Sequence, residues 1–195
     1  MPLINVKERK REIRYRCKKL RAACPPELKA KLDKKLTQSF LSLAEYAKCE
    51  TLFIFISSKI ECDTSVIISR ALADGKKVAV PKCRNKWGNM DFYFIASTEQ
   101  LKPGFFSIPE PDPTLCERVA EYSKGLCVVP GLCFDYTGYR VGFGKGYYDR
   151  FLESFDGVTV GLCYSRFVER ELPRGIFDKP TDILVTEKFI NRNDT

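Results

Sequence analysis

The sequence predicts an α/β fold, a three-layer single domain around a mostly parallel sheet. Short runs of β-branched and aromatic residues alternate along the chain with longer segments of helical periodicity. One strand, helix, strand succession has the spacing of a βαβ unit, which requires parallel pairing and a right-handed crossover. With 195 residues, of which 44% are hydrophobic, the chain suits one core. Residues 1–195 are therefore expected to form one domain.

The first fifty residues are expected to form two helices. In the first, over about 6–23, Ile13, Cys17 and Leu20 recur at helical spacing and make an apolar stripe. The second runs to about Lys48 after the pair Pro25-Pro26. Its apolar positions recur every three or four residues: Leu28, Leu32, Leu36, Phe40 and Leu43.

The rest of the chain alternates between strands and helices. Segment 63–75 predicts a helix that Asp63 or Thr64 caps and Gly75 ends. Segment 146–155 predicts another helix. Six runs rich in β-branched and aromatic residues predict buried strands, at 51–57, 76–81, 90–96, 125–131, 157–165 and 181–186.

Composition excludes several kinds of chemistry and location. The chain has no histidine, which rules out Ser-His-Asp triads, Cys-His dyads and histidine-bearing metal sites. Its nine cysteines form no CxxC pair, so we expect reduced thiols rather than zinc or redox centres. No apolar run approaches the roughly 18 residues of a membrane span, and the first residues lack a signal peptide's apolar core. Glu8 and Glu12 argue against a transit peptide, so a cytoplasmic protein is expected.

The net charge of +8 is confined to the start of the chain. Residues 1–50 hold 14 of the 33 basic and 6 of the 25 acidic residues, so the remainder is balanced at 19 of each. Lys10, Arg14 and Arg21 are spaced by four and seven and share one helix face. That face is either a solvated basic surface or an anion-binding one, and the charge pattern leaves both open.

A glycine-rich stretch, GYRVGFGKGYYDRFL at 138–152, follows a predicted strand and opens a helix. Glycines there let backbone N–H groups converge on one ligand, Lys145 supplies a formal charge and Arg140 a guanidinium fork. The stretch matches neither GxxxxGK[ST] nor GxGxxG. The residues alone leave two alternatives, a phosphate-binding loop and a mobile surface turn. Likewise, Asp149 either caps the helix or holds Mg²⁺.

The longer segment PGLCFDYTGYRVGFGKGYYDRFL resembles the signature of the 5-formyltetrahydrofolate cyclo-ligase (methenyltetrahydrofolate synthetase) family, roughly PGLxFDxxGxRLGxGxGYYDRxL. The opening KREIR with Arg21, the segment IECDTSVII and the segment DILVTE resemble further motifs of that family, in the same order. The likeness extends over about residues 7–188. It implies a fold like that of the sugar-phosphate isomerase and CoA-transferase group.

The resemblance implies an ATP- and Mg²⁺-dependent conversion of 5-formyltetrahydrofolate to 5,10-methenyltetrahydrofolate, with release of ADP and phosphate. It assigns Lys145 and Arg140 to the migrating phosphoryl group. It assigns the other residues to three groups: ATP-binding Lys10, Arg14, Arg140, Gly142, Gly144, Lys145, Gly146, Tyr147 and Tyr148; folate-binding Ile56, Glu61, Met90, Phe106, Phe143 and Tyr147; and metal-binding Asp149 and Asp182.

Two positions depart from the family pattern. Phe106 stands where some members have Trp, and Phe143 replaces an Arg of some relatives and a Tyr of others, so a cationic role is lost there. Two other functions remain as alternatives, a basic nucleic-acid-binding protein and a different ATP-dependent small-molecule ligase on the same scaffold. We expect small-molecule substrates, no nucleic-acid or membrane partner, and a monomer.

Overall fold

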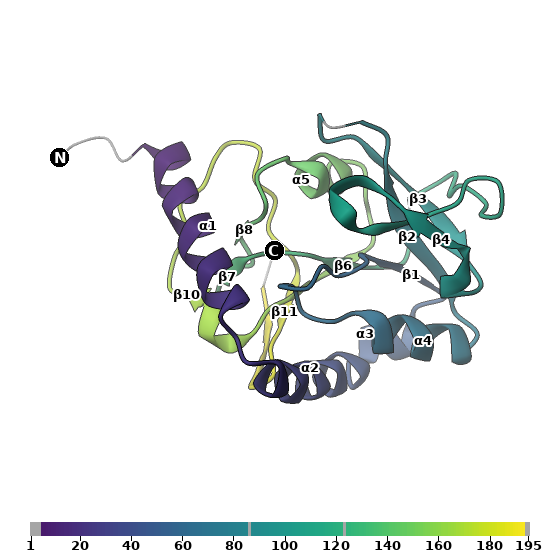
Figure 1. Ribbon diagram of the computed structural model, residues 1–195, viewed down its shortest axis with the longest axis horizontal. Coiled ribbons are helices and arrows are strands. Elements are labelled where there is room, and N and C mark those ends of the chain that lie inside the picture. The colour runs from purple at the N-terminus through teal and green to yellow at the C-terminus, as the bar shows by residue number, and fades with distance from the viewer. Residues whose placement is uncertain (1–4, 86, 123, 194–195) are drawn as a thin grey trace.

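A computed structural model describes residues 5–85, 87–122 and 124–193. Its centre is a seven-stranded sheet in the order β12-β11-β9-β6-β1-β2-β3 (Figure 1). The pairings β2–β1, β1–β6, β6–β9 and β9–β11 are parallel, and the two outermost pairings are antiparallel. The mostly parallel sheet is therefore confirmed. Its strands are β1 Thr51–Ile54, β2 Lys77–Cys83, β3 Met90–Ile95, β6 Leu126–Val129, β9 Val158–Leu162, β11 Ile183–Val185 and β12 Ile190–Arg192.

Three inner strands, β1, β2 and β6, each contribute side chains to two separate cores. In β1, Leu52 and Ile54 belong to one buried cluster and Phe53 to the other, as the two-residue period of a strand requires. The second cluster also holds Phe151 and Phe155, which lie in and just after α5 (Tyr147–Leu152). Helices α2, α3 and α4 lie together on the other side of the sheet (Figure 1). The sheet is thus covered on both faces, which gives the three layers.

The βαβ unit consists of β1, α4 (Ser65–Ala73) and β2. The Asp63 carboxylate accepts a hydrogen bond of 2.9 Å from Ser65 N–H, whereas the Thr64 hydroxyl donates to the carbonyl of Phe55. Of the two predicted capping residues, Asp63 is therefore the one whose side chain bonds to the helix. Gly75 follows the helix with a φ of 74°, a left-handed conformation that glycine adopts readily.

The expected single helix up to about Lys48 is wrong. The structure has two helices, α2 (Pro26–Leu41) and α3 (Ala44–Lys48). Between them Leu43 is extended, with φ −65° and ψ 133°. The break lets the Tyr46 hydroxyl donate a hydrogen bond of 2.7 Å to Asp74, at the end of α4. A tertiary contact therefore overrides the local helical pattern.

The first helix, α1 (Val6–Ala22), is capped by the side chain of Asn5. It packs beside a three-stranded sheet of order β10-β7-β8, with β7 Cys133–Asp135, β8 Arg140–Val141 and β10 Val168–Glu169. A two-stranded pair, β4 Leu101–Pro103 and β5 Pro109–Pro111, packs against β2. Short 3-10 turns cover Thr98–Gln100, Phe105–Ser107 and Ser165–Phe167. In the described part of the chain, no helix has the length and apolarity to cross a membrane.

Candidate functional site

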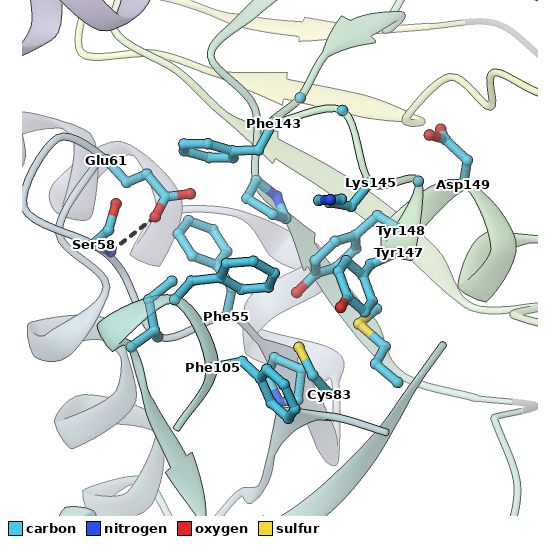
Figure 2. Close-up of a pocket in the computed structure, with 18 of the residues that line it drawn as sticks. Phe55, Ser58, Glu61, Cys83, Phe105, Phe143, Lys145, Tyr147, Tyr148 and Asp149 are labelled. Carbon is cyan, nitrogen blue, oxygen red and sulfur yellow. Dashed lines mark hydrogen bonds between the residues drawn. The ribbon is translucent and has the colours of Figure 1, made fainter. Parts of the chain in front are cut away.

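A cavity of about 500 Å³ opens where the carboxyl ends of β1 and β6 meet α1 and the glycine-rich loop (Figure 2). This is the edge of a parallel sheet at which ligands usually bind. All but one of the predicted site residues line the cavity: Lys10, Arg14, Ile56, Glu61, Met90, Phe106, Arg140, Gly142, Phe143, Gly144, Lys145, Gly146, Tyr147, Tyr148 and Asp149. The exception is Asp182.

The cations of α1 face this cavity. The Lys10 ammonium pairs with Asp178, and Arg14 Nε donates a hydrogen bond of 2.9 Å to the carbonyl of Gly142. The first bond holds α1 against the loop that carries Asp178, and the second holds it against the glycine-rich loop. The geometry therefore favours the anion-binding interpretation of Lys10 and Arg14 over a solvated basic face.

Arg21 does not share that role. Its side chain is buried, and its guanidinium donates hydrogen bonds to the carbonyls of Leu132, Gly131 and Ile60, at 2.9 to 3.2 Å. The guanidinium also lies 4.6 Å from the ring centre of Phe167. The prediction that Arg21 shares a face with Lys10 and Arg14 is therefore wrong, because its side chain points into the protein. Leu20, which was expected in the apolar stripe, is 41% exposed instead.

The glycine-rich loop has unusual backbone freedom. Gly144 and Gly146 have φ values of 97° and 71°, and a Cβ at Gly144 would lie 3.2 Å from the Arg14 guanidinium. Within the described chain, the N–H groups of residues 142–146 donate no hydrogen bond, and the Lys145 ammonium has no ion pair. The loop amides and Lys145 are therefore the candidate anion-binding groups, rather than the terminus of α5, which has only six residues.

An ion pair between Arg140 and Asp149 lies beneath the glycine-rich loop and connects it to a neighbouring loop. Arg140 donates one hydrogen bond of 2.7 Å to Asp149 Oδ1 and another of 2.6 Å to the carbonyl of Lys179. Its side chain is 4% exposed, while that of Asp149 is 28% exposed. Arg140 therefore joins the beginning of α5 to the loop that carries Asp178.

The two carboxylates predicted to bind a metal are not brought together in this cavity. Asp182 Oδ2 accepts hydrogen bonds of 2.7 Å from both N–H and Oγ1 of Thr159, at the amino end of the parallel strands β9 and β11. The cavity lies at the carboxyl ends. The acidic side chain that does line it near Asp149 and Lys10 is Asp178, which the sequence analysis missed.

The other end of the cavity is aromatic and contains two buried carboxyls, Glu61 and Glu110, of which Glu110 pairs with Lys82. Glu61 is 4% exposed, and its Oε2 accepts a hydrogen bond of 2.8 Å from Ser58 N–H. Burial raises the pKa of Glu61, and the hydrogen bond from Ser58 opposes that rise. Phe106 lies edge-on to Tyr147, with 6.4 Å between the ring centres, and Tyr147 donates to the carbonyl of Asn85.

Phe106 also departs from ordinary backbone geometry. Its φ is 58°, that of Ser107 is 59°, and its side chain is 56% exposed at the cavity. Left-handed conformations cost energy in residues other than glycine and gather at ligand sites. The turn therefore holds an aromatic ring over the cavity at some conformational cost.

Lys18 is a further residue that the sequence analysis missed. Its ammonium lies 5.2 Å from the centre of the Phe143 ring, and both residues line the cavity. Positive charge is thus present beside Phe143 although the side chain itself is neutral. The signal was available, because Lys10, Arg14 and Lys18 recur every four residues on one helix face. Asp178 lies in an irregular loop where no comparable periodicity exists.

The fold and this cavity together define an α/β enzyme whose cavity joins a cationic, glycine-rich loop to an aromatic chamber with buried carboxyls. A model of the 5-formyltetrahydrofolate cyclo-ligase family matches residues 6–187, and the chain belongs to that family.

Known members of the family are similar to this chain over most of their length. The chain is 27% identical to the mouse 5-formyltetrahydrofolate cyclo-ligase, over 96% of this chain and 98% of that one. It is 32% identical to the mitochondrial 5-formyltetrahydrofolate cyclo-ligase of Arabidopsis thaliana, over 94% and 74%. The NMR structure of the Aquifex aeolicus 5,10-methenyltetrahydrofolate synthetase superposes with a TM-score of 0.82 and 34% identity, over 95% and 93%.

Proposed function

We propose that this protein is an ATP-dependent cyclo-ligase that converts 5-formyltetrahydrofolate to 5,10-methenyltetrahydrofolate and releases ADP and phosphate. One observation carries the proposal: Lys10 and Arg14 of the first helix line the same cavity as Lys145 of the glycine-rich loop and Glu61 of the aromatic chamber. ATP supplies the anion for one end and a folate supplies the ring system for the other. The family membership supports the same activity.

The reaction needs activation of a poor electrophile. In the proposed route the formyl oxygen attacks the γ-phosphorus of ATP, the bond from phosphorus to the ADP oxygen breaks, and an imino-phosphate forms. N10 of the folate then attacks the formyl carbon and loses its proton to the solvent, and the carbon–oxygen bond breaks as phosphate leaves. Phosphoryl transfer depends mainly on positioning and charge neutralisation, so the absence of histidine is no obstacle.

The cations divide between the two parts of the nucleotide. We assign Lys145 and Arg140 to the migrating phosphoryl group, and Lys10 and Arg14 to the remaining phosphates. Asp178, the partner of Lys10, must then share that ammonium with ATP. The unused N–H groups of residues 142–146 supply further donors for phosphate oxygens.

The aromatic end suits a folate. We assign Ile56, Met90 and Phe106 to contact with the folate rings, and Glu61 to the polar edge of the pterin. Phe143, with Lys18 over its ring, lies between the two ends of the cavity in this scheme. The chain contributes all these segments from residue 10 to residue 178, which supports one catalytic domain over 1–195.

Mg²⁺ is proposed as the metal. It prefers oxygen ligands and commonly combines one or two carboxylates with phosphate oxygens and water. Asp149 and Asp178 both line the phosphate end of the cavity and fit that pattern. When bound, the ion would neutralise charge on the phosphates during transfer. Asp182, bonded to Thr159, is not part of this proposal.

Location and assembly are also proposals. All nine cysteines are free thiols, which suits a reducing compartment such as the cytoplasm. We propose a monomer with small-molecule substrates. A nucleic-acid-binding role has less support, because the cations of α1 at Lys10, Arg14 and Lys18 line the same cavity as Glu61 and the aromatic side chains.

The test is the growth of methenyl absorbance from 5-formyltetrahydrofolate with Mg²⁺ and ATP. We expect turnover, and we expect Mg²⁺-ATP to raise the melting temperature. A steep salt-dependent affinity for oligonucleotides without a response to Mg²⁺-ATP would favour a nucleic-acid-binding protein instead. Stabilisation by Mg²⁺-ATP without a methenyl product would point to another ATP-dependent ligase.

Lys145 provides the sharpest variant for this proposal. Lys145→Ala should lose about 2–4 kcal/mol of transition-state stabilisation with little change in the free energy of unfolding. Lys145→Arg should also be impaired, because a planar guanidinium does not replace a compact ammonium. Lys48→Ala, an exposed lysine at the end of α3, is the control. Near-normal turnover of Lys145→Ala would remove Lys145 from the mechanism.

A further inference from the structure

Two buried hydroxyl groups in the cavity have no hydrogen-bond partner in the described part of the chain, Ser58 Oγ and Tyr148 Oη. A buried polar atom without a partner costs roughly 1–3 kcal/mol, and native proteins leave few of them. The adjacent Tyr147 shows the contrast, because its hydroxyl donates a hydrogen bond of 2.6 Å to the carbonyl of Asn85. Two such atoms in one cavity point to a ligand that supplies the missing partners.

The Tyr148 hydroxyl lies where the two ends of the cavity meet. Figure 2 shows the hydroxyl ends of Tyr147 and Tyr148 directed into the cavity on the side that faces Phe55. A phenol is protonated at physiological pH and can therefore serve as a hydrogen-bond donor.

The Ser58 hydroxyl lies beside the buried carboxyl of Glu61. Ser58 N–H donates to Glu61 Oε2 at 2.8 Å, so the backbone of Ser58 holds Glu61 while its own side chain remains unbonded. A carboxyl and a hydroxyl side by side present an acceptor and a donor together. This pairing suits the amide and amino edge of a heterocycle.

We propose that Tyr148 Oη donates a hydrogen bond to the formyl oxygen of the folate, and that Ser58 Oγ bonds to the pterin edge beside Glu61. This inference rests on the proposed function and deepens it. It moves Tyr148 from the nucleotide, where the family resemblance assigned it, to the second substrate. The formyl oxygen must face the phosphoryl group that it attacks. A fixed donor on the cavity wall, which Tyr148 shares with Glu61 and Arg140, selects the rotamer of the formamide that does so.

The test uses Tyr148→Phe and two ligands that differ only in the formyl group. Calorimetry without ATP should show that the variant binds 5-formyltetrahydrofolate about tenfold more weakly than wild type and tetrahydrofolate equally well. Ser58→Ala should weaken both ligands to a similar extent. In turnover, Tyr148→Phe should lower kcat/KM for the folate and leave the KM for ATP unchanged.

Melting temperatures without ligand separate this role from a structural one. Because its hydroxyl has no partner, Tyr148→Phe should melt at the same temperature as wild type or higher. Tyr46→Phe is the control outside the cavity: it loses a hydrogen bond of 2.7 Å to Asp74 and should melt about 2–4 °C lower with normal folate binding.

Three results would overturn the inference. These are equal binding of both ligands by Tyr148→Phe and wild type, a raised KM for ATP with unchanged folate binding, and a melting temperature that falls as in Tyr46→Phe. If wild type itself neither binds 5-formyltetrahydrofolate nor forms the methenyl product, the proposed function fails, which is a different result from a null effect of Tyr148→Phe in an active enzyme.

Discussion

Arg21 joins three chain segments through one guanidinium. Its hydrogen bonds reach the carbonyls of Gly131 and Leu132, just after Pro130 of the cavity wall, and the carbonyl of Ile60, next to Glu61. Each of these carbonyls would otherwise be buried without a partner. Arg21 therefore fixes the first helix relative to both ends of the cavity without touching a substrate.

Replacement of Arg21 should destabilise the fold. Arg21→Met leaves the three carbonyls unpaired and should lower the free energy of unfolding by about 3–5 kcal/mol. Arg21→Lys should recover only part of that loss, because a single ammonium cannot bond to all three carbonyls. Denaturation in urea measures both, with Lys19→Met on the exposed face of the same helix as the control. A loss below 1 kcal/mol for Arg21→Met would contradict the role.

Glu61 should make stability depend on pH in an unusual direction. Burial raises its pKa in the folded state, so folding favours the protonated form. The contribution of Glu61 to the free energy of unfolding is fully present below the pKa of an unfolded glutamic acid, about 4.3. It is lost as the pH rises through the pKa of Glu61 in the folded state. Glu61→Gln should remove this dependence. We expect the difference in unfolding free energy between Glu61→Gln and wild type to grow with pH over that window. A difference that stays constant with pH would refute a raised pKa of Glu61 in the folded state.

At the scale of elements, α1 and the glycine-rich loop form one unit. Gly144 has a left-handed φ of 97°, and the Arg14 guanidinium lies where its side chain would be. Arg14 in turn donates to the carbonyl of Gly142. The loop can approach the helix this closely because it carries no side chain at Gly144.

Gly144→Ala should therefore affect activity as well as stability. The positive φ should cost about 1–2 kcal/mol of stability, and displacement of Arg14 should raise the KM for ATP. Gly75→Ala is a matched control, because its φ is 74° but a Cβ there meets no atom within 4 Å. It should lose similar stability and keep a normal KM. Equal KM values for both variants would argue against the contact with Arg14.

The elements that the sequence predicted well are the buried ones. The apolar runs around Phe53, Val80 and Val128 are strands because both of their faces are covered, which leaves a continuous apolar pattern. The short strands β7 and β8 have three and two residues, too few for any periodicity. The break at Leu43 depends on a contact with a distant helix, which no local pattern records.

The site was predictable where one motif held it together. Residues 140–149 are contiguous, so their arrangement follows from a single loop. Asp178 was missed because it lies in an irregular segment, and only the folded chain shows that it faces Lys10. Asp182 was assigned to the metal from the family resemblance, whereas in the structure it bonds to Thr159. Arg21 was grouped with Arg14 from spacing alone, although the helix turns it toward buried carbonyls.

At the scale of the whole molecule, the excess positive charge lies near the opening of the cavity, which we call the substrate entrance. Residues 1–50 carry the entire net charge of +8, and their helix α1 borders the cavity. ATP and the glutamate-bearing folate are both anions. A cationic entrance raises the local concentration of such ligands and speeds their association.

The rate at low substrate should therefore fall with salt. Between about 0.02 and about 0.5 M KCl, kcat/KM should decrease several-fold while kcat stays nearly constant, because screening weakens steering more than contacts inside the cavity. Lys18→Gln should flatten this dependence, and Lys48→Gln should not. Salt-independent kcat/KM would show that the charge serves another purpose.

The first and the last described elements, α1 and β12, differ in their position relative to the cavity, and this has a practical consequence. Asn5 caps the helix that carries Lys10 to the cavity, whereas β12 runs antiparallel to β11, so Arg192 lies beside Ile183 at the amino edge of the sheet. A purification tag or fluorescent partner fused ahead of Asn5 would crowd the substrate entrance. Fused after β12, the same partner would leave that entrance clear, so labels for kinetic work belong at the carboxyl end.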